Sequence, residues 1–193
     1  MKKKNKQVCF SRNKIKALIG NLLIGLSIAI VLFIYYPIIM VYSLPIQINK
    51  VNADFSIEIP KIKLVSPVIK NVDAFNEKEY RKALIKGIAQ AKGSTLPGEK
   101  GTIFLFGHSS DYPWNLTRYN TIFLRLGDLE KNDLVILKKD GKEYRYRVFD
   151  KKVVWPNEVN YLSQNNKTQL ILQTCTPIGT AFQRLLVFAT PID

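Results

Sequence analysis

An uncharged stretch near the start of the chain limits most strongly what this sequence can fold into. Residues 17–43 contain no Asp, Glu, Lys or Arg, and about 20 helical residues are enough to cross the hydrocarbon core of a bilayer. The apolar part of a cleaved secretory signal is shorter, at about 7–15 residues. A helix buried in a soluble core is seldom uncharged on every face. We therefore predict a transmembrane signal anchor that stays on the protein.

The charges beside this stretch predict its orientation in the membrane. Residues 1–16 form a tail with seven basic and no acidic residues, which favours a cytoplasmic N-terminus. Pro37 is expected to bend or end the helix. Residues 44–54 are expected to be a linker, and residues 55–193 a single extracytoplasmic domain of ordinary size. The predicted location is the cell membrane, crossed once, with lipid as one partner.

Composition narrows the remaining classes of function. The chain has 29 Lys and Arg against 15 Asp and Glu, for a net charge of +14. Because seven basic residues lie in the tail, residues 44–193 hold only a +7 excess, spread without a dense basic block. No nucleic-acid partner is predicted, whereas a basic surface facing an anionic envelope stays open. Two Cys and one His exclude a disulfide-dense scaffold, a multi-cysteine zinc or iron–sulfur site and any site that needs several imidazoles. The sequence shows no compact acidic cluster for calcium, and no metal or cofactor is predicted.

The outer region reads as mostly short strands. Alternating apolar residues and turn signals predict strands at residues 102–106, 133–137, 143–149, 170–174 and 185–190, and two short strands or one kinked edge strand within 55–69. Helical spacing predicts a helix over 77–91 and a helical turn at 122–126. Loops are expected at 93–101 and around 112–114, and a hairpin turn at Asp140 and Gly141. This pattern indicates a mainly β fold, closed or nearly closed into a barrel.

Three side chains that carry chemistry stand at strand ends. Cys175 ends one apolar strand, and Arg184 begins the next. If these strands pair as a hairpin, Cys175 and Arg184 meet at the same edge of the sheet. His108 also follows a strand, directly after a glycine. Strand ends beside loops are where a rigid scaffold usually presents a site.

These residue types suit nucleophilic catalysis. A thiolate is the nucleophile, and an imidazole is its usual activator. Moving a proton from an ordinary thiol to an ordinary imidazole costs about 2.7 kcal/mol. An ion pair about 4 Å apart recovers about 4 kcal/mol at an effective dielectric of 20, so a neutral pair and an ion pair both stay open. A guanidinium is a fixed donor to a carbonyl or an oxyanion. Singly, each residue type is more often structural: a buried thiol, a hydrogen-bonding histidine, a surface arginine.

Four segments resemble the sortases, the membrane-anchored cysteine transpeptidases of bacterial surfaces. The first strand pair of that family is similar to IEIPKIKLVSPVI, and the middle of its barrel is similar to LGDLEKNDLVILKKDGKEYRYRV. The segment with the catalytic histidine is similar to GSTLPGEKGTIFLFGHSS, and the segment with the catalytic cysteine and arginine to LILQTCTPIGTAFQRLLVFAT. The resemblance covers nearly all of residues 50–190 and fits the predicted anchor. It implies an eight-stranded β-barrel with short helices.

The resemblance also implies roles for individual residues. Cys175 would attack the Thr–Gly carbonyl of a sorting signal similar to Leu-Pro-x-Thr-Gly and form a thioacyl-enzyme. His108 would protonate the leaving amine and then deprotonate the incoming amine, while Arg184 would hold the substrate or the oxyanion. The backbone N–H of Thr176 is a candidate second oxyanion donor, and Thr174 would shape the floor of the substrate site. The acceptor would be a cell-wall precursor or a pilin lysine, and water in its place would give hydrolysis.

Subclass and activity leave alternatives open. The short stretch between Trp155 and Leu170 differs from the class B insertion, and residues 111–114 resemble the Asp-Pro-aromatic lid of class C only in part. A housekeeping type near class D or E is expected. Two alternatives are a catalytically silent sortase-like scaffold that binds surface proteins and a basic module that binds the wall. A Cys175 sulfur more than about 8 Å from His108 and Arg184 would favour the silent scaffold.

Overall fold

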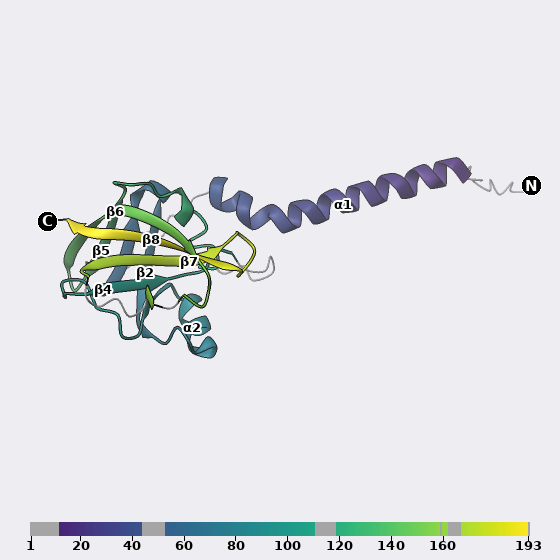
Figure 1. Ribbon diagram of the computed structural model, residues 1–193. Helices are drawn as coiled ribbons and strands as arrows, with labels where there is room; N and C mark the ends of the chain where they lie inside the picture. Colours follow the sequence, from purple (N-terminus) through teal and green to yellow (C-terminus); the bar gives the residue numbers. More distant parts are fainter. Residues whose placement is uncertain (1–11, 44–52, 111–118, 159, 162–166, 193) are drawn as a thin grey trace, which may run out of the picture. The chain divides into compact units, whose positions relative to one another are not determined.

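The chain forms one long N-terminal helix and a closed β-barrel in a computed structural model that describes residues 12–43, 53–110, 119–158, 160–161 and 167–192. The helices are α1 (Arg12–Ser43) and α2 (Glu77–Leu84), with short 3-10 segments η1 (Pro60–Ile62) and η2 (Leu126–Asp128). The strands are β1 (Phe55–Ile59), β2 (Leu64–Val72), β3 (Ile88–Ala91), β4 (Thr102–Phe106), β5 (Leu134–Lys139), β6 (Lys142–Val154), β7 (Gln169–Thr176) and β8 (Gln183–Ile192). Figure 1 shows their arrangement.

Helix α1 contains most of the stretch that the sequence predicts to cross the membrane. Residues Lys14–Tyr36 are long and apolar enough to cross a bilayer, and none of this stretch is buried in the protein. The helix begins earlier than the uncharged stretch, and it continues past Pro37 to Ser43. Of the two expectations for Pro37, an end of the helix is therefore wrong, because a helix can continue through a proline at the loss of one backbone hydrogen bond, and a bend stays a prediction. The chain divides into two compact units after Tyr36, so that most of α1 belongs to one unit and the barrel to the other.

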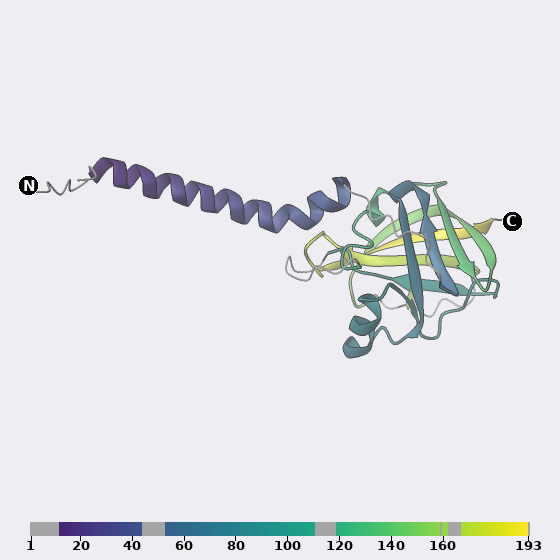
Figure 2. The same cartoon turned by 180° about the vertical axis from the view of Figure 1, so that it is seen from behind.

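The predicted mainly β, eight-stranded fold is confirmed. The strands close in the order β1-β2-β3-β4-β7-β8-β6-β5, with β5 paired back to β1. Six of the neighbouring pairs are antiparallel, whereas β2–β3 and β4–β7 are parallel. Figure 1 shows β7 and β8 on one side of the barrel, and Figure 2 shows β1 and β2 on the other. Since β4 and β7 run the same way, their C-terminal ends meet at one edge.

Alternation along the strands divides the core into two layers. On β4, Ile103 and Leu105 belong to the cluster that fills the barrel, while Phe104 and Phe106 belong to a second cluster. The second cluster also contains Ala83 and Leu84, so α2 packs on the outside of the barrel. Successive side chains of a strand point to opposite faces. Strand β4 therefore has an interior face and an outer face, both apolar, as expected for a strand buried on both sides.

The predicted helix over residues 77–91 is correct only in its first half. Helix α2 begins at an Asn76 cap, whose side chain accepts a hydrogen bond from the Glu79 N–H, and ends at Leu84. Residues Ile88–Ala91 form β3, which is buried throughout and pairs with β2 in parallel. A Cβ on Gly87 would lie 2.4 Å from the Pro67 carbonyl oxygen. The chain at Gly87 therefore runs close against β2, and strand pairing outweighs the local helical spacing.

Most other predicted elements are confirmed with longer bounds. The segment 55–69 forms two strands, and the loop at 93–101 is present. The hairpin between β5 and β6 turns at Asp140 and Gly141, whose φ angles of 52° and 75° suit a type I′ turn. Residues 119–125 form hydrogen-bonded turns and lead into η2, close to the helical turn expected there. The predicted loop and partial lid at residues 111–114 lie outside the described residues.

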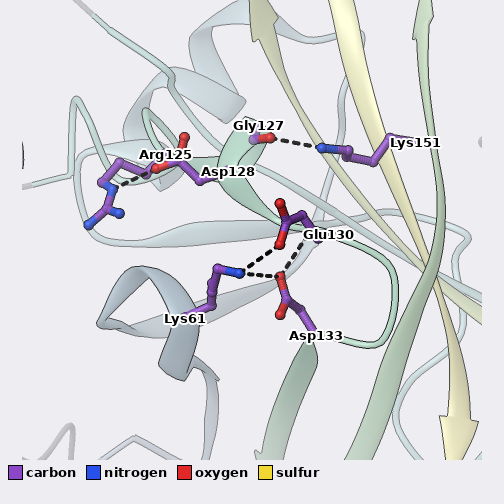
Figure 3. Close-up of polar contacts among 7 residues, drawn as sticks. All are labelled: Lys61, Arg125, Gly127, Asp128, Glu130, Asp133 and Lys151. Atoms are coloured by element: carbon purple, nitrogen blue, oxygen red, sulfur yellow. Dashed lines mark hydrogen bonds and ion pairs between the residues drawn. The ribbon is translucent and has the colours of Figure 1, made fainter.

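Lysine side chains from η1 and β6 contact η2 and the segment that leads into β5 (Figure 3). Lys61 Nζ lies 2.9 Å from Glu130 Oε2 and 3.6 Å from Asp133 Oδ2, and Lys151 Nζ donates to the Gly127 carbonyl at 2.9 Å. The hydrogen bond to Glu130 raises the pKa of Lys61. Exposed ion pairs of this kind contribute little to stability. They link η1 and β6 to η2 and to the chain between η2 and β5.

Truncation of the barrel core should destabilise the fold. Leu137 is fully buried on β5, and Leu137→Ala is expected to lower the free energy of unfolding by about 2–5 kcal/mol, since it leaves a cavity. The measurement is denaturant unfolding of the detergent-solubilised chain, followed by tryptophan fluorescence. Ile85→Ala is the control, because Ile85 is 52% exposed and such changes usually cost under about 0.5 kcal/mol. Equal costs for the two variants would contradict this account of the core.

Candidate active site

The pairing of β4 and β7 brings His108 to Cys175. Phe106 is the register partner of Gln173 in this parallel pair, and the Gly107 N–H donates to the Gln173 carbonyl at 3.1 Å. His108 therefore follows Phe106 by two residues, as Cys175 follows Gln173 by two. Adjacent strands lie about 4.8 Å apart, so the two residues occupy neighbouring positions at one edge of the barrel.

Arg184 lies on the other side of Cys175. Strands β7 and β8 form the predicted hairpin, and Cys175 and Arg184 are direct register partners in it. The hairpin is the yellow-green pair in Figure 1. The expectation that these two residues meet at one edge of the sheet is confirmed. The order across the edge is thus histidine, cysteine, arginine on three consecutive strands.

Alternation places all three side chains on one face of the sheet. Phe106, Ile171 and Leu186 belong to the outer cluster. His108, Cys175 and Arg184 are each an even number of residues from one of these on the same strand or its extension, so they share the outer face. All three are half-buried. None of the three residues is fully buried.

The guanidinium of Arg184 is held by its own hairpin. Its Nη1 donates to the carbonyl oxygens of Ala181 at 2.9 Å and Gln183 at 3.2 Å. A guanidinium has five N–H donors in a rigid fork, so these bonds orient the group and leave other donors for a ligand. A carbonyl or an oxyanion beside Cys175 would be the natural acceptor.

The backbone around His108 is held on several sides. The Phe123 N–H donates to the His108 carbonyl at 2.9 Å, and a Cβ on Gly107 would lie 2.9 Å from Phe123 Cδ2. Two residues further, Ser110 Oγ accepts a hydrogen bond from the Gly179 N–H at 2.8 Å. This last bond ties the chain after the histidine to the hairpin that carries the cysteine and the arginine. The site is therefore built on a constrained backbone.

Thr174 and Thr176, the two residues predicted to bind the oxyanion or the substrate, have surroundings that differ from those of the other three predicted site residues. Thr174 is 4% exposed, shares the interior face with Leu170 and Leu172, and its Oγ1 donates to the Gly107 carbonyl at 2.9 Å. The structure does not bring its side chain to the face of Cys175. Thr176 is half-buried, faces Gln183 across the hairpin and precedes a cis peptide bond to Pro177. An oxyanion contact of the Thr176 amide stays a prediction.

Among the described residues, no group of three or more His, Cys, Asp or Glu side chains is placed to hold a metal ion. Cys175 is a free thiol, with no disulfide partner in the described part of the chain. The groups that Cys175, His108 and Arg184 would offer are a nucleophile, a proton carrier and a cationic donor. Those are the groups required for covalent acyl transfer.

Sequence reasoning missed three supporting residues. Gly107 was visible as a glycine before the histidine, but its close contact with Phe123 depends on a turn in another part of the chain. Phe123 and Ser110 gave no signal, because their bonds to the His108 carbonyl and the Gly179 N–H join distant segments. Such contacts carry no periodic pattern in a sequence.

The fold is a closed eight-stranded barrel, with Cys175 paired to Arg184 at one edge and His108 just beyond the neighbouring strand. Comparison with known proteins gives the family. Residues 57–192 match the sortase domain, and the chain belongs to the sortase family. The expected resemblance is confirmed over almost the whole barrel.

Individual relatives and structures agree with this assignment. The chain is 32% identical over 136 residues to Sortase D of Bacillus subtilis (strain 168), covering 68% of this chain and 60% of that protein. It is 28% identical over 131 residues to Sortase A of Bacillus anthracis, covering 68% and 56%. Sortase A from Corynebacterium diphtheriae superposes with a TM-score of 0.60 at 29% identity, covering 72% of this chain and 60% of that one. The matches span under two thirds of the relatives' own lengths. A class D-like assignment is consistent with the first of them.

The contact between Gly107 and Phe123 should make position 107 intolerant of a side chain. Gly107→Ala is expected to lower the free energy of unfolding by about 1–3 kcal/mol, because the new methyl overlaps the buried Phe123 ring. The measurement is denaturant unfolding.

A double variant and a second glycine control this prediction. In Gly107→Ala/Phe123→Leu, the loss should be smaller than the sum of the two single losses, since the smaller side chain relieves the overlap. Gly127→Ala should cost less than Gly107→Ala, because the nearest atom to its Cβ is Leu185 Cδ2 at 3.7 Å. Additive losses in the double variant would show that the ring does not limit position 107.

Proposed function

We propose that the chain is a membrane-anchored cysteine transpeptidase that acts on sorting signals of surface proteins. The observation that carries this proposal is the register of three consecutive strands. Cys175 is the register partner of Arg184, and the bond from the Gly107 N–H to the Gln173 carbonyl at the end of the β4–β7 pair supports a place for His108 beside Cys175. Family membership supports the same reaction class, since the site holds the residues that the resemblance requires.

In the first half of the proposed reaction, the Cys175 thiolate attacks the Thr–Gly carbonyl of a signal similar to Leu-Pro-x-Thr-Gly. A carbon–sulfur bond forms, and the carbonyl electrons move to oxygen. Arg184 donates hydrogen bonds to that oxygen, with the Thr176 N–H as a candidate second donor. Collapse of the intermediate breaks the C–N bond, and His108 gives its proton to the leaving glycine amine. The product is a thioacyl-enzyme.

In the second half, an amine acceptor attacks the thioacyl carbonyl. His108 accepts the proton of the incoming amine, and the Cys175 thiolate leaves. A cell-wall precursor or a pilin lysine is the proposed acceptor, and water in its place would give hydrolysis. A housekeeping type near class D or E is the proposed subclass, supported by the 32% identity to Sortase D over 136 residues.

The proposed location follows from α1 and the charges that precede it. In the part of the chain that the structure describes, one helix is long and apolar enough to span a membrane, and the tail before it is basic without acidic residues. We propose a cytoplasmic N-terminus and an extracytoplasmic barrel. In that orientation the site faces the compartment where surface proteins and wall precursors are found.

The test incubates the full-length chain in detergent with peptides of the form Leu-Pro-x-Thr-Gly, varied at the first and third positions, and a glycine-based amine. Mass spectrometry should detect a thioacyl adduct on Cys175 and an amine-exchanged peptide. Cys175→Ala should abolish both products, because the nucleophile is removed. Cys9→Ala is the matched control, since Cys9 is the other cysteine of the chain and should be dispensable. A folded chain that gives no adduct with any peptide would favour the silent-scaffold alternative.

The geometry of Arg184 gives a second prediction. Arg184→Lys keeps the positive charge but removes the fork of donors that Ala181 and Gln183 orient. We expect kcat to fall by about 10²–10³, the usual effect of losing an oxyanion donor. Steady-state kinetics on the best peptide would measure this fall. Full activity in the lysine variant would show that charge alone, without directed hydrogen bonds, is sufficient.

A further inference from the structure

A buried hydroxyl continues the ladder between β4 and β7 beyond the last paired residues. Thr174 Oγ1 donates to the Gly107 carbonyl at 2.9 Å in a buried environment. The Gly107 N–H is itself bound to the Gln173 carbonyl at 3.1 Å. Strand β7 therefore holds the Gly107 residue through both its N–H and its carbonyl, immediately before the histidine.

This contact is placed to control the distance between the two reactive residues. Gly107 immediately precedes His108 in the chain, and Thr174 immediately precedes Cys175. The Thr174–Gly107 hydrogen bond thus spans the two strands one residue before the pair that must exchange a proton. Beyond it, the backbone of His108 is held by the Phe123 N–H, which belongs to a separate segment.

The position of Thr174 argues against direct contact with a substrate. Its side chain is 4% exposed and lies on the interior face with Leu170 and Leu172, opposite the face of Cys175. Its hydroxyl proton is already donated to a backbone carbonyl. A buried carbonyl that loses such a donor is costly to leave unpaired, so the strand end would shift to find another partner.

We propose that Thr174 is a positioning residue, which acts through the Gly107 carbonyl to hold His108 in register with Cys175. This inference rests on the proposed cysteine transpeptidase function. It replaces the substrate-binding role predicted for Thr174 by an indirect one. A β-branched side chain suits the task, because its χ1 angle is restricted and the hydroxyl stays aimed at one acceptor.

The kinetic test compares substitutions that separate the hydroxyl from the shape of the side chain. Thr174→Val keeps the shape and removes the donor, so kcat should fall about 10- to 100-fold, as expected when reacting groups are displaced by about 1 Å. KM should stay within about twofold. Thr174→Ser restores the donor and should recover most of the lost kcat. Thr174→Ala is a second hydroxyl-free variant that introduces no bulk, in case the valine variant folds poorly.

Thr102 provides a matched control in the same pair of strands. Its Oγ1 donates to the Lys167 carbonyl at 3.0 Å, it is 1% exposed, and its register partner is Gln169 at the far end of the β4–β7 pair. Thr102→Val likewise removes a buried threonine hydroxyl, which in this case also accepts a hydrogen bond from Gln169 Nε2 at 3.3 Å. It should lower the unfolding temperature to a similar extent as Thr174→Val and leave kcat unchanged.

A readout without substrate separates positioning from binding. The chain contains one histidine, so a histidine ring label gives a single NMR signal from His108. In the wild-type background, Cys175→Ala should shift the titration midpoint of that signal, since the neighbouring thiol is lost. In the Thr174→Val background, the same substitution should produce a smaller shift. Thr102→Val should leave the wild-type shift intact.

The outcomes distinguish the two proposals. A Thr174→Val enzyme with raised KM, normal kcat and an unaltered histidine response would overturn the positioning role and favour contact with substrate. A loss of kcat that Thr174→Ser fails to recover would also overturn it. If the folded wild-type chain forms no thioacyl adduct, the proposed function fails, whereas the histidine response still tests whether Thr174 sets the register.

Discussion

The parallel pairing of β4 and β7 is the constraint on which the site depends. An antiparallel pair would place the C-terminal ends of the two strands at opposite edges of the barrel. In the observed register, Phe106 faces Gln173, and the chain beyond each strand reaches the same edge with a histidine on one side and a cysteine on the other. The hairpin of β7 and β8 then adds an arginine without any further long-range contact.

Two apolar layers keep that edge rigid. The interior cluster fills the barrel, and the outer cluster packs under α2, so β4 is buried on both faces and cannot slide without exposing phenylalanine side chains. A shift of one residue in register would exchange its two faces. The polar contacts at the strand end, from Thr174, Phe123 and Ser110, act on a frame that is already fixed by packing.

The sequence correctly predicted those elements whose structure depends on residues close together in the chain. The Asp140–Gly141 turn, the short strands and the Cys175–Arg184 hairpin could all be predicted, because turn chemistry and alternation act over a few residues. Residues 88–91 were misassigned to a helix for the opposite reason. Their helical spacing is real, but Gly87 packs against Pro67, and parallel pairing with β2 depends on a strand far away in the sequence.

The sequence alone predicted an apolar stretch long enough to span a membrane, a basic tail, a mainly β domain and, within that domain, a single candidate pair of histidine and cysteine. These features can be predicted because composition and the alternation of apolar and polar residues depend only on residues close together in the chain. Only the tertiary structure decided which face each residue occupies and how the strand ends align. It moved Thr174 from the substrate side to the interior and revealed Gly107 as the point of contact between the strands. Hydrogen bonds between residues so far apart in the chain leave no periodic trace, because they are fixed by the closure of the barrel.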